Sequence, residues 1–264
     1  MPFRLHILTF ILLAGCLSAR GQDLRTGIPL ADGQYLAAGE YLAWLDENGD
    51  ILRTHPLDRT LTALIESNAH LYALDTEGQE LLELDWDGHL LGQEKLPVQG
   101  HLRSLSADGT ILWAVTDAGE IAHGSTGSGW TVLDFNAQYA GYYPPMTFWA
   151  VAAGGGSILV AGTTPGGTPA AFTSVRGTVW SERSLDYTEA GLTCTFSALP
   201  MGLSYDTAQD RFYLLGSGGE ELALPGCSHC NSHTQYPVNT LYARISAGFG
   251  TLLLGSDGFR KKIN

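Results

Sequence analysis

Cysteine and histidine side chains gather in one short polar segment of the 264-residue chain. Cys227, His229, Cys230 and His233 lie within seven residues, and Cys194 lies upstream. The side chains of Cys227, Cys230 and His233 are spaced closely enough to surround one tetrahedral Zn²⁺ ion. Either Cys194 or His229 is available as the fourth ligand. A structural zinc site is therefore one interpretation of this segment.

The first residues of the chain have the pattern of an export signal. Arg4 is followed by an apolar run over residues 5–15, which is too short to span a bilayer. The run ends in Leu13-Ala14-Gly15-Cys16, which resembles the lipobox of bacterial lipoproteins. The resemblance implies that the signal is cut before Cys16 and that this cysteine receives lipids.

These features predict three segments and a location in the cell envelope. We expect a signal peptide over residues 1–15, and a lipidated N-terminus and linker over residues 16–33, which includes a possible ring-closing strand. The globular domain then occupies residues 34–264. The lipid is the expected contact with a bacterial membrane. The alternative is ordinary cleavage near Ala19 or Gly21, which would give a secreted or periplasmic chain.

Export favours a disulfide over zinc in the cysteine segment. Thiolates bind metal only when they are reduced, and an oxidising compartment pairs cysteines by default. Cys194 could pair with Cys227 or Cys230, or the last two could pair with each other; unpaired or intermolecular thiols are the remaining alternative. The c-type haem motif is incomplete because Asn231 follows Cys230. We predict one oxidised pair and no cofactor, with zinc at Cys227, Cys230 and His233 as the alternative.

The elements that must position these residues are read as strands. Six short apolar runs each end in a small or acidic turn that a glycine closes, and the closing glycines are spaced on average about 42 residues apart. A period of 40–45 residues with several strands per unit is typical of propellers. The residues that close the turns are glycines 49, 78, 119, 166, 219 and 258. We predict an all-β, six-bladed β-propeller, with a pair of β-sandwiches as the alternative.

Each unit also offers a strand before its apolar run, but the two ends of the chain are irregular. The first spacing, from Gly49 to Gly78, is short, so we expect the first blade to lack a full outer strand. The last unit stops one strand short of a complete blade. We expect residues 24–30 to complete it and close the ring, because closure removes unpaired edges.

Two repeats resemble known propeller families. The segment from Leu71 to Leu91 is similar to a repeat of six-bladed NHL-type propellers. The segments Ser125–Trp130 and Ser174–Trp180 resemble degenerate Asp-box turns of BNR-type propellers, although both lack the aspartate of that motif. The resemblance implies the architecture and no particular activity, because propellers serve both as binding scaffolds and as enzymes.

Charge and motifs limit the function further. The formal net charge is −13, and residues 46–94 hold 12 acidic and two basic residues, which argues against a nucleic-acid partner. The sequence has no Gly-x-Ser-x-Gly, no His-Glu-x-x-His and no phosphate-binding loop, so we assign no catalytic residue. Tyr139, Tyr142 and Tyr143 are candidate binding-loop residues. We expect a binding or scaffold module for a protein or glycan partner; the alternative is a hydrolase or lyase with carboxylates in the channel.

Overall fold

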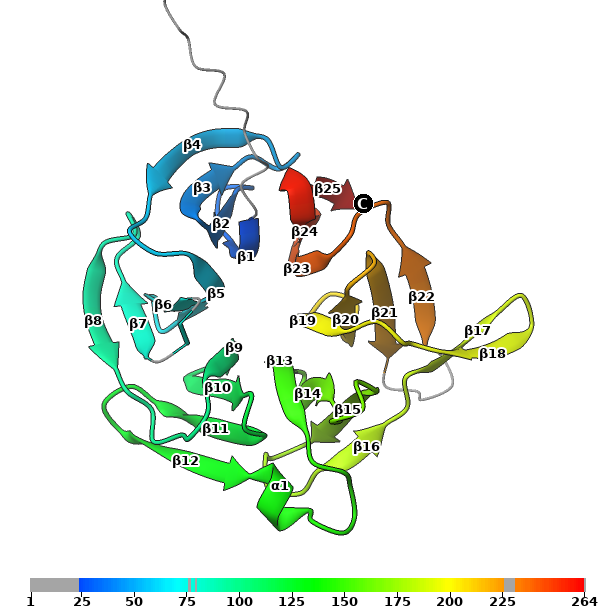
Figure 1. Cartoon of the computed structure of the whole chain (residues 1–264). Coiled ribbons are helices and arrows are strands. Elements are labelled where there is room, and N and C mark those ends of the chain that lie inside the picture. The colour runs from blue at the N-terminus through cyan, green and yellow to red at the C-terminus, as the bar shows by residue number, and fades with distance from the viewer. Residues whose placement is uncertain (1–23, 76, 79, 226–230, 264) are drawn as a thin grey trace, which may run out of the picture.

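Six antiparallel sheets surround a central axis in the computed structural model, like the blades of a propeller (Figure 1). The structure describes residues 24–75, 77–78, 80–225 and 231–263. The expected six-bladed β-propeller is confirmed, and the pair of β-sandwiches is excluded. No described helix is long and apolar enough to cross a membrane.

Each blade begins with the strand nearest the axis and ends at the rim (Figure 1). The hairpin of β17 and β18 projects outward between blades 4 and 5, and helix α1 lies at the rim of blade 3. Blade 1 is β1 (Leu24–Pro29), β2 (Tyr35–Gly39), β3 (Tyr41–Leu45) and β4 (Ile51–Pro56), and blade 2 is β5 (Leu61–Ser67), β6 (His70–Asp75), β7 (Leu81–Leu84) and β8 (Leu90–Glu94). Blade 3 is β9 (Leu102–Asp108), β10 (Ile111–Thr116), β11 (Glu120–Ser125) and β12 (Gly129–Asp134), followed by α1 (Phe135–Gln138), and blade 4 is β13 (Thr147–Gly154), β14 (Ser157–Thr163), β15 (Pro169–Ser174) and β16 (Ser181–Arg183), followed by the hairpin of β17 (Asp186–Glu189) and β18 (Leu192–Thr195). Blade 5 is β19 (Pro200–Asp206), β20 (Arg211–Gly216), β21 (Glu220–Pro225) and β22 (Ser232–Gln235), and blade 6 is β23 (Leu241–Ala247), β24 (Gly250–Gly255), the short 3-10 helix Ser256–Gly258 and β25 (Arg260–Ile263).

The N-terminal strand differs from its expected role. β1 is the innermost strand of blade 1, where it pairs with β2 in the register Ile28↔Leu36, and blade 6 has three strands. The strand suits this place because Leu24 packs against blade 6 while Ile28 packs against blade 2. The domain thus includes residues before 34. Blade 1 also has a complete outer strand, β4, contrary to expectation.

The short first spacing has a simple structural cause. Gly49 lies in the turn between the third and fourth strands of blade 1, whereas Gly78, Gly119 and Gly219 lie between the second and third strands of their blades. The second and third strands of blade 1 are joined by a tighter turn at Glu40. The first glycine of the series is therefore not equivalent to the others.

The equivalent glycines lie where the chain enters the next blade. The carbonyl oxygens of Gly78, Gly119 and Gly219 each accept a hydrogen bond from an amide in the following connection or, for Gly78, from the first residue of the next blade. Their φ angles are positive, and a Cβ atom on Gly78 would lie 2.3 Å from the Leu102 carbonyl oxygen. Only glycine allows this approach without strain, which explains the glycine in the repeat.

Acidic residues stabilise several of these turns. Asp46 Oδ1 accepts hydrogen bonds from the amides of Asn48 and Asp50, and Asp85 Oδ1 accepts from those of Asp87 and His89. These backbone hydrogen bonds hold the pKa of Asp46 and of Asp85 below its usual value. Some of the acidic residues in the run over residues 46–94 therefore serve to stabilise turns.

The described core is divided among the six interfaces between neighbouring blades. An apolar cluster fills each interface, and the second strands contribute side chains to both neighbours, as expected for strands covered on two faces. The cluster between blades 5 and 6 has four buried members, Leu215, Tyr236, Leu241 and Leu253, and is the smallest. That interface holds a buried ion-pair network in addition.

Candidate site at one mouth of the channel

All six innermost strands carry a β-bulge at the same level, close to the start of the strand. In each strand the pairing with the second strand of the blade skips one residue just after the first pair or pairs. A bulge changes the direction of a side chain. The skipped residues, in blade order, are Arg25, Thr62, Arg103, Trp149, Met201 and Tyr242.

The six bulged residues line one cavity at the mouth of the central channel. This mouth cavity has a volume of about 190 Å³ and overlaps a channel cavity of about 350 Å³ that is lined by all six inner strands. All six side chains are half-buried. We call these residues the bulge ring. The backbone repeats around the axis, whereas the side chains differ in chemistry, as expected of a site built on a repetitive fold.

The blade order places unlike groups across the channel. Arg25 of blade 1 lies beside Tyr242 of blade 6, with its guanidinium carbon 5.8 Å from the ring centre. Arg103 of blade 3 lies beside Trp149 of blade 4, at 5.4 Å. Each arginine thus has an aromatic neighbour, and the two pairs come from opposite sides of the ring. The hydroxyl of Thr62 and the thioether of Met201 occupy the two remaining sides.

The two arginines differ in their charge partners. Arg103 donates from Nε to Asp117 Oδ2 at 3.1 Å, and His101 Nδ1 lies 3.2 Å from the same oxygen. Burial tends to raise the pKa of Asp117, but hydrogen bonds from Arg103 and from the His101 amide outweigh it and hold that pKa below its usual value. Arg25 forms no ion pair with any described residue, and its Nε is buried without a hydrogen-bond partner there.

Hydroxyl groups fix the inner strands to one another. Thr26 Oγ1 of β1 accepts from the Leu64 amide of β5 at 2.8 Å. Ser104 and Ser106 of β9 accept from amides of β13, at 3.2 and 2.9 Å. These bonds satisfy inner-edge amides that would otherwise face the channel unpaired, and they join β1 to β5 and β9 to β13.

Carboxylates do not converge in the described channel. Asp75 lines the mouth cavity. Its Oδ2 forms an ion pair with Arg59 Nη1 at 3.2 Å, and its Oδ1 accepts hydrogen bonds from the amides of Glu77 and Gly78. Glu66 lines the channel cavity four residues beyond Thr62 along β5, about 13 Å away at 3.3 Å per residue. No histidine is among the described residues that line either cavity.

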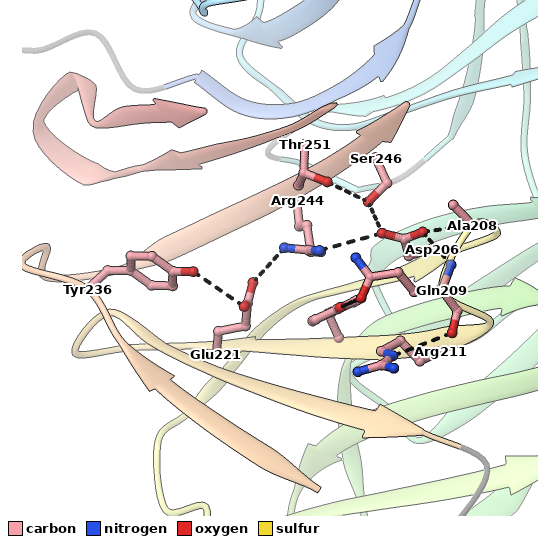
Figure 2. Close-up of polar contacts among 10 residues, drawn as sticks. Asp206, Ala208, Gln209, Arg211, Glu221, Tyr236, Arg244, Ser246 and Thr251 are labelled. Atoms are coloured by element: carbon pink, nitrogen blue, oxygen red, sulfur yellow. Dashed lines mark hydrogen bonds and ion pairs between the residues drawn. The ribbon is translucent and has the colours of Figure 1, made fainter. Parts of the chain in front are cut away.

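A second ionic cluster lies buried between blades 5 and 6 (Figure 2). Arg244 Nη1 donates to Glu221 Oε2 at 3.3 Å, and its Nη2 lies 3.5 Å from Asp206 Oδ2. Ser246 donates to Asp206 at 2.9 Å, and the guanidinium of Arg244 stacks on the ring of Tyr213. The ionic side chains are at most 7% exposed. The cluster joins two blades and has little access to a substrate.

Of the cysteine and histidine residues proposed as zinc ligands or disulfide partners, the structure describes Cys194 and His233. Cys194 lies opposite Tyr187 in the β17–β18 hairpin and has no disulfide partner among the described residues, and the Tyr187 ring stacks on His233 at 4.5 Å. His233 Nε2 lies 3.5 Å from Glu220 Oε2. Among the described residues, no group of three or more His, Cys, Asp or Glu could hold a metal. Cys227, His229 and Cys230 lie outside the described residues, as does Cys16, so the disulfide, zinc and lipidation hypotheses stay predictions.

The three candidate tyrosines do not form one surface. Tyr139 and Tyr143 pack against Phe135 at the rim between blades 3 and 4, and the Tyr139 hydroxyl accepts from the Trp180 amide. Tyr142 is 83% exposed. The loop lies at the outer edge of the ring, away from the bulge ring (Figure 1).

Sequence reasoning missed the bulge ring. A signal exists, since in every inner strand a buried apolar residue or proline directly precedes the bulged residue, as in Leu102-Arg103 or Leu241-Tyr242. The signal has meaning only once the six strand starts are aligned with one another.

Comparison with solved structures supports the fold. One similar structure is a catalytically inactive virginiamycin B lyase from Staphylococcus aureus, a histidine-to-alanine variant with quinupristin. It superposes on this chain with a TM-score of 0.61 at 10% sequence identity, over 93% of this chain and 85% of the lyase. The WD40 propeller of Doa1 gives 0.61 at 7% identity over 91% and 78% of the chains, and a streptogramin B lyase gives 0.58 at 10% identity over 94% and 95%. No protein-family model and no curated protein matches the sequence. At these identities the likeness concerns the fold alone.

Proposed function

We propose that the chain is an exported, lipid-anchored propeller that binds a protein or glycan partner of the cell envelope through the bulge ring. The observation that carries this proposal is the coincidence of six bulges with one mouth cavity. A bulge in every blade at one level places six different side chains around one ligand-sized opening. Aromatic and arginine side chains are the groups that most often dominate binding energy.

A blocked mouth tests this role. Met201→Trp should fill the cavity from blade 5, whereas Leu91→Trp adds the same ring at the exposed rim of blade 2. Wild type and both variants are immobilised, after their melting temperatures are shown to agree, and exposed to purified envelope proteins and to a glycan array. We expect Met201→Trp to lose the partner that wild type and Leu91→Trp retain. Equal retention by all three proteins would contradict the proposal.

The anchor rests on the Leu13–Cys16 pattern. The full chain is produced in a bacterial host and its N-terminal peptide is analysed by mass spectrometry. We expect a lipid adduct on Cys16, and Cys16→Ser should release the protein from the membrane fraction. A lipid-free chain that starts at Arg20 or Gln22 would refute the anchor and leave secretion intact.

A propeller hydrolase or lyase is the second candidate. The two lyase structures of like fold favour it, and Glu66 and Asp75 are the carboxylates it would have to use. A streptogramin B cyclic peptide is incubated with the protein and followed by mass spectrometry. We expect the peptide to remain intact. Ring opening that Glu66→Gln or Asp75→Asn abolishes would replace the binding proposal by this one.

A further inference from the structure

We propose that the bulge ring recognises a singly charged carboxylate carried on a flat apolar group, with Arg25 as its anion-binding residue. The inference rests on the proposed binding function and adds the chemical class of the ligand. The two sources of such a group are a free aromatic acid and the C-terminal carboxylate of a peptide that ends in an aromatic residue.

The balance of charges around the mouth cavity favours a ligand with one negative charge. Asp117 compensates the charge of Arg103, and Arg59 compensates that of Asp75. Among the described residues this leaves Arg25 as the one uncompensated charge of the mouth cavity. One carboxylate would neutralise it, whereas a phosphate monoester dianion would leave an excess negative charge in a partly desolvated site. A neutral ligand would leave the guanidinium without a counter-charge.

The geometry of the donor favours a carboxylate as well. A guanidinium offers a planar fork of N–H groups that matches the two oxygens of a carboxylate. Arg25 is held at the mouth by its position in the bulge and by its neighbour Tyr242. A planar ion pair can therefore form with little loss of side-chain freedom.

The opposite wall is suited to the flat apolar part of the ligand. Trp149 lies across the ring from Arg25, and its indole nitrogen already donates to Thr163 Oγ1 at 3.1 Å. The hydrogen bond fixes the indole. Arg103 lies over the ring at 5.4 Å, and the part of the indole that lines the mouth cavity is the surface for stacking. Met201, in the next blade, provides a polarizable surface that adapts to aromatic edges.

The test compares matched ligands by isothermal titration calorimetry and ligand-observed NMR. The probes are 3-phenylpropionate, its amide, phenyl phosphate, acetate, a uronic-acid sugar, and a short peptide ending in Phe with either a free or an amidated C-terminus. We expect the carboxylates to bind at least about tenfold more tightly than their amides, because a charged hydrogen bond is lost in the amides. A free acid that binds as tightly as the peptide identifies a small-molecule site; a much tighter peptide identifies a chain terminus.

Variants assign the role of Arg25. Arg25→Gln should weaken carboxylate binding at least about tenfold, and Arg25→Lys should retain part of it. Arg53→Gln is the matched control, because Arg53, like Arg25, lies beside an aromatic ring, here the indole of Trp44 at 3.7 Å, but at the outside of blade 1. Trp149→Phe should reduce the affinity for the aromatic acid more than that for acetate. Melting temperatures verify that the variants fold.

Three results would overturn the inference: equal affinity for acid and amide, unchanged binding by Arg25→Gln, or tighter binding of phenyl phosphate. A uronic-acid sugar that binds while the aromatic acids do not would also overturn it, in favour of a glycan. If none of the probes binds but Met201→Trp still loses an envelope partner, the ligand class is wrong and the proposed function stands.

Discussion

Arg244 and Glu221 form an ion pair across the interface of the last two blades, with 3.3 Å between Nη1 and Oε2. The side chains are 4% and 7% exposed, so neither charge is shielded by water. Burial raises the pKa of Glu221, and the charge of Arg244 opposes that rise. This pair occupies the interface with the smallest apolar cluster.

Loss of the arginine should therefore be costly. Arg244→Met leaves Glu221 and Asp206 buried without their cation, and we expect the free energy of unfolding to fall by about 3–5 kcal/mol in urea titrations near neutral pH. The loss should shrink as the pH falls, because Glu221 can then be protonated. Adding Glu221→Gln should recover part of it.

The control is Arg53→Met, which removes an exposed pair with Asp87 at 3.7 Å and should cost about 1 kcal/mol or less. If Arg244→Met is as mild as Arg53→Met, the buried pair does not hold the two blades together.

Gly78 should resist substitution. Its φ is +58°, and a Cβ atom would lie 2.3 Å from the Leu102 carbonyl, immediately before Arg103 of the bulge ring. Gly78→Ala should lower the free energy of unfolding by about 2 kcal/mol or more through backbone strain and the clash. Gly109→Ala is the control: φ is +62°, but nothing lies within 4 Å, so strain alone should cost about 1 kcal/mol. Equal losses would mean that the connection shifts freely.

The sequence was sufficient to predict the blade count. Runs such as Leu71–Leu74, buried on both faces, alternate with glycine turns at a regular spacing, and both features depend on local chemistry. The turn glycine Gly49 has the same local signature as Gly78, so only strand pairing shows that it belongs to a different turn. The strand order at the chain ends differs from the prediction for another reason. β1 pairs with its sequence neighbour β2 in a local hairpin, whereas the expected pairing with blade 6 would have been a long-range contact.

The candidate site is built from residues that are far apart in the sequence, so it was harder to predict than the fold. Arg25 and Tyr242 stand near opposite ends of the chain and become neighbours only when the ring closes. Tyr139 and Tyr143, which are conspicuous in the sequence, pack against the core between blades 3 and 4 and do not line this site.

Asp117 should make stability depend on pH in the acid range. Hydrogen bonds and charge hold its folded pKa below the ordinary value of 3.8, so its contribution is present above that value and is lost as the pH falls through the folded pKa. Asp117→Asn should therefore be less stable than wild type at pH 6, and the difference should narrow between pH 5 and pH 2, measured by thermal unfolding. A difference independent of pH would show that the carboxylate charge is not what Arg103 and His101 recognise.

The proposed export and the position of the hairpin both bear on the thiol state of the cysteine segment. Asn231, the residue after Cys230 in the sequence, donates from Nδ2 to the carbonyls of Ser184 and Asp186 at the base of the β17–β18 hairpin, the hairpin that carries Cys194. A bond from Cys194 to Cys227 or Cys230 would join the hairpin to blade 5; a bond between the latter two would close a small loop.

We predict one disulfide, one free thiol among these three cysteines and no metal in the purified, exported chain. Thiol counting in denaturant and elemental analysis measure this directly, and non-reducing peptide mapping assigns the pair. Reductant should lower the melting temperature. If the pair includes Cys194, the free energy of unfolding should fall by about 2–4 kcal/mol, because that bond closes the longer loop. A chelator should have no effect. One zinc per chain with three free thiols, and a melting temperature that responds to the chelator, would instead establish the alternative site at Cys227, Cys230 and His233.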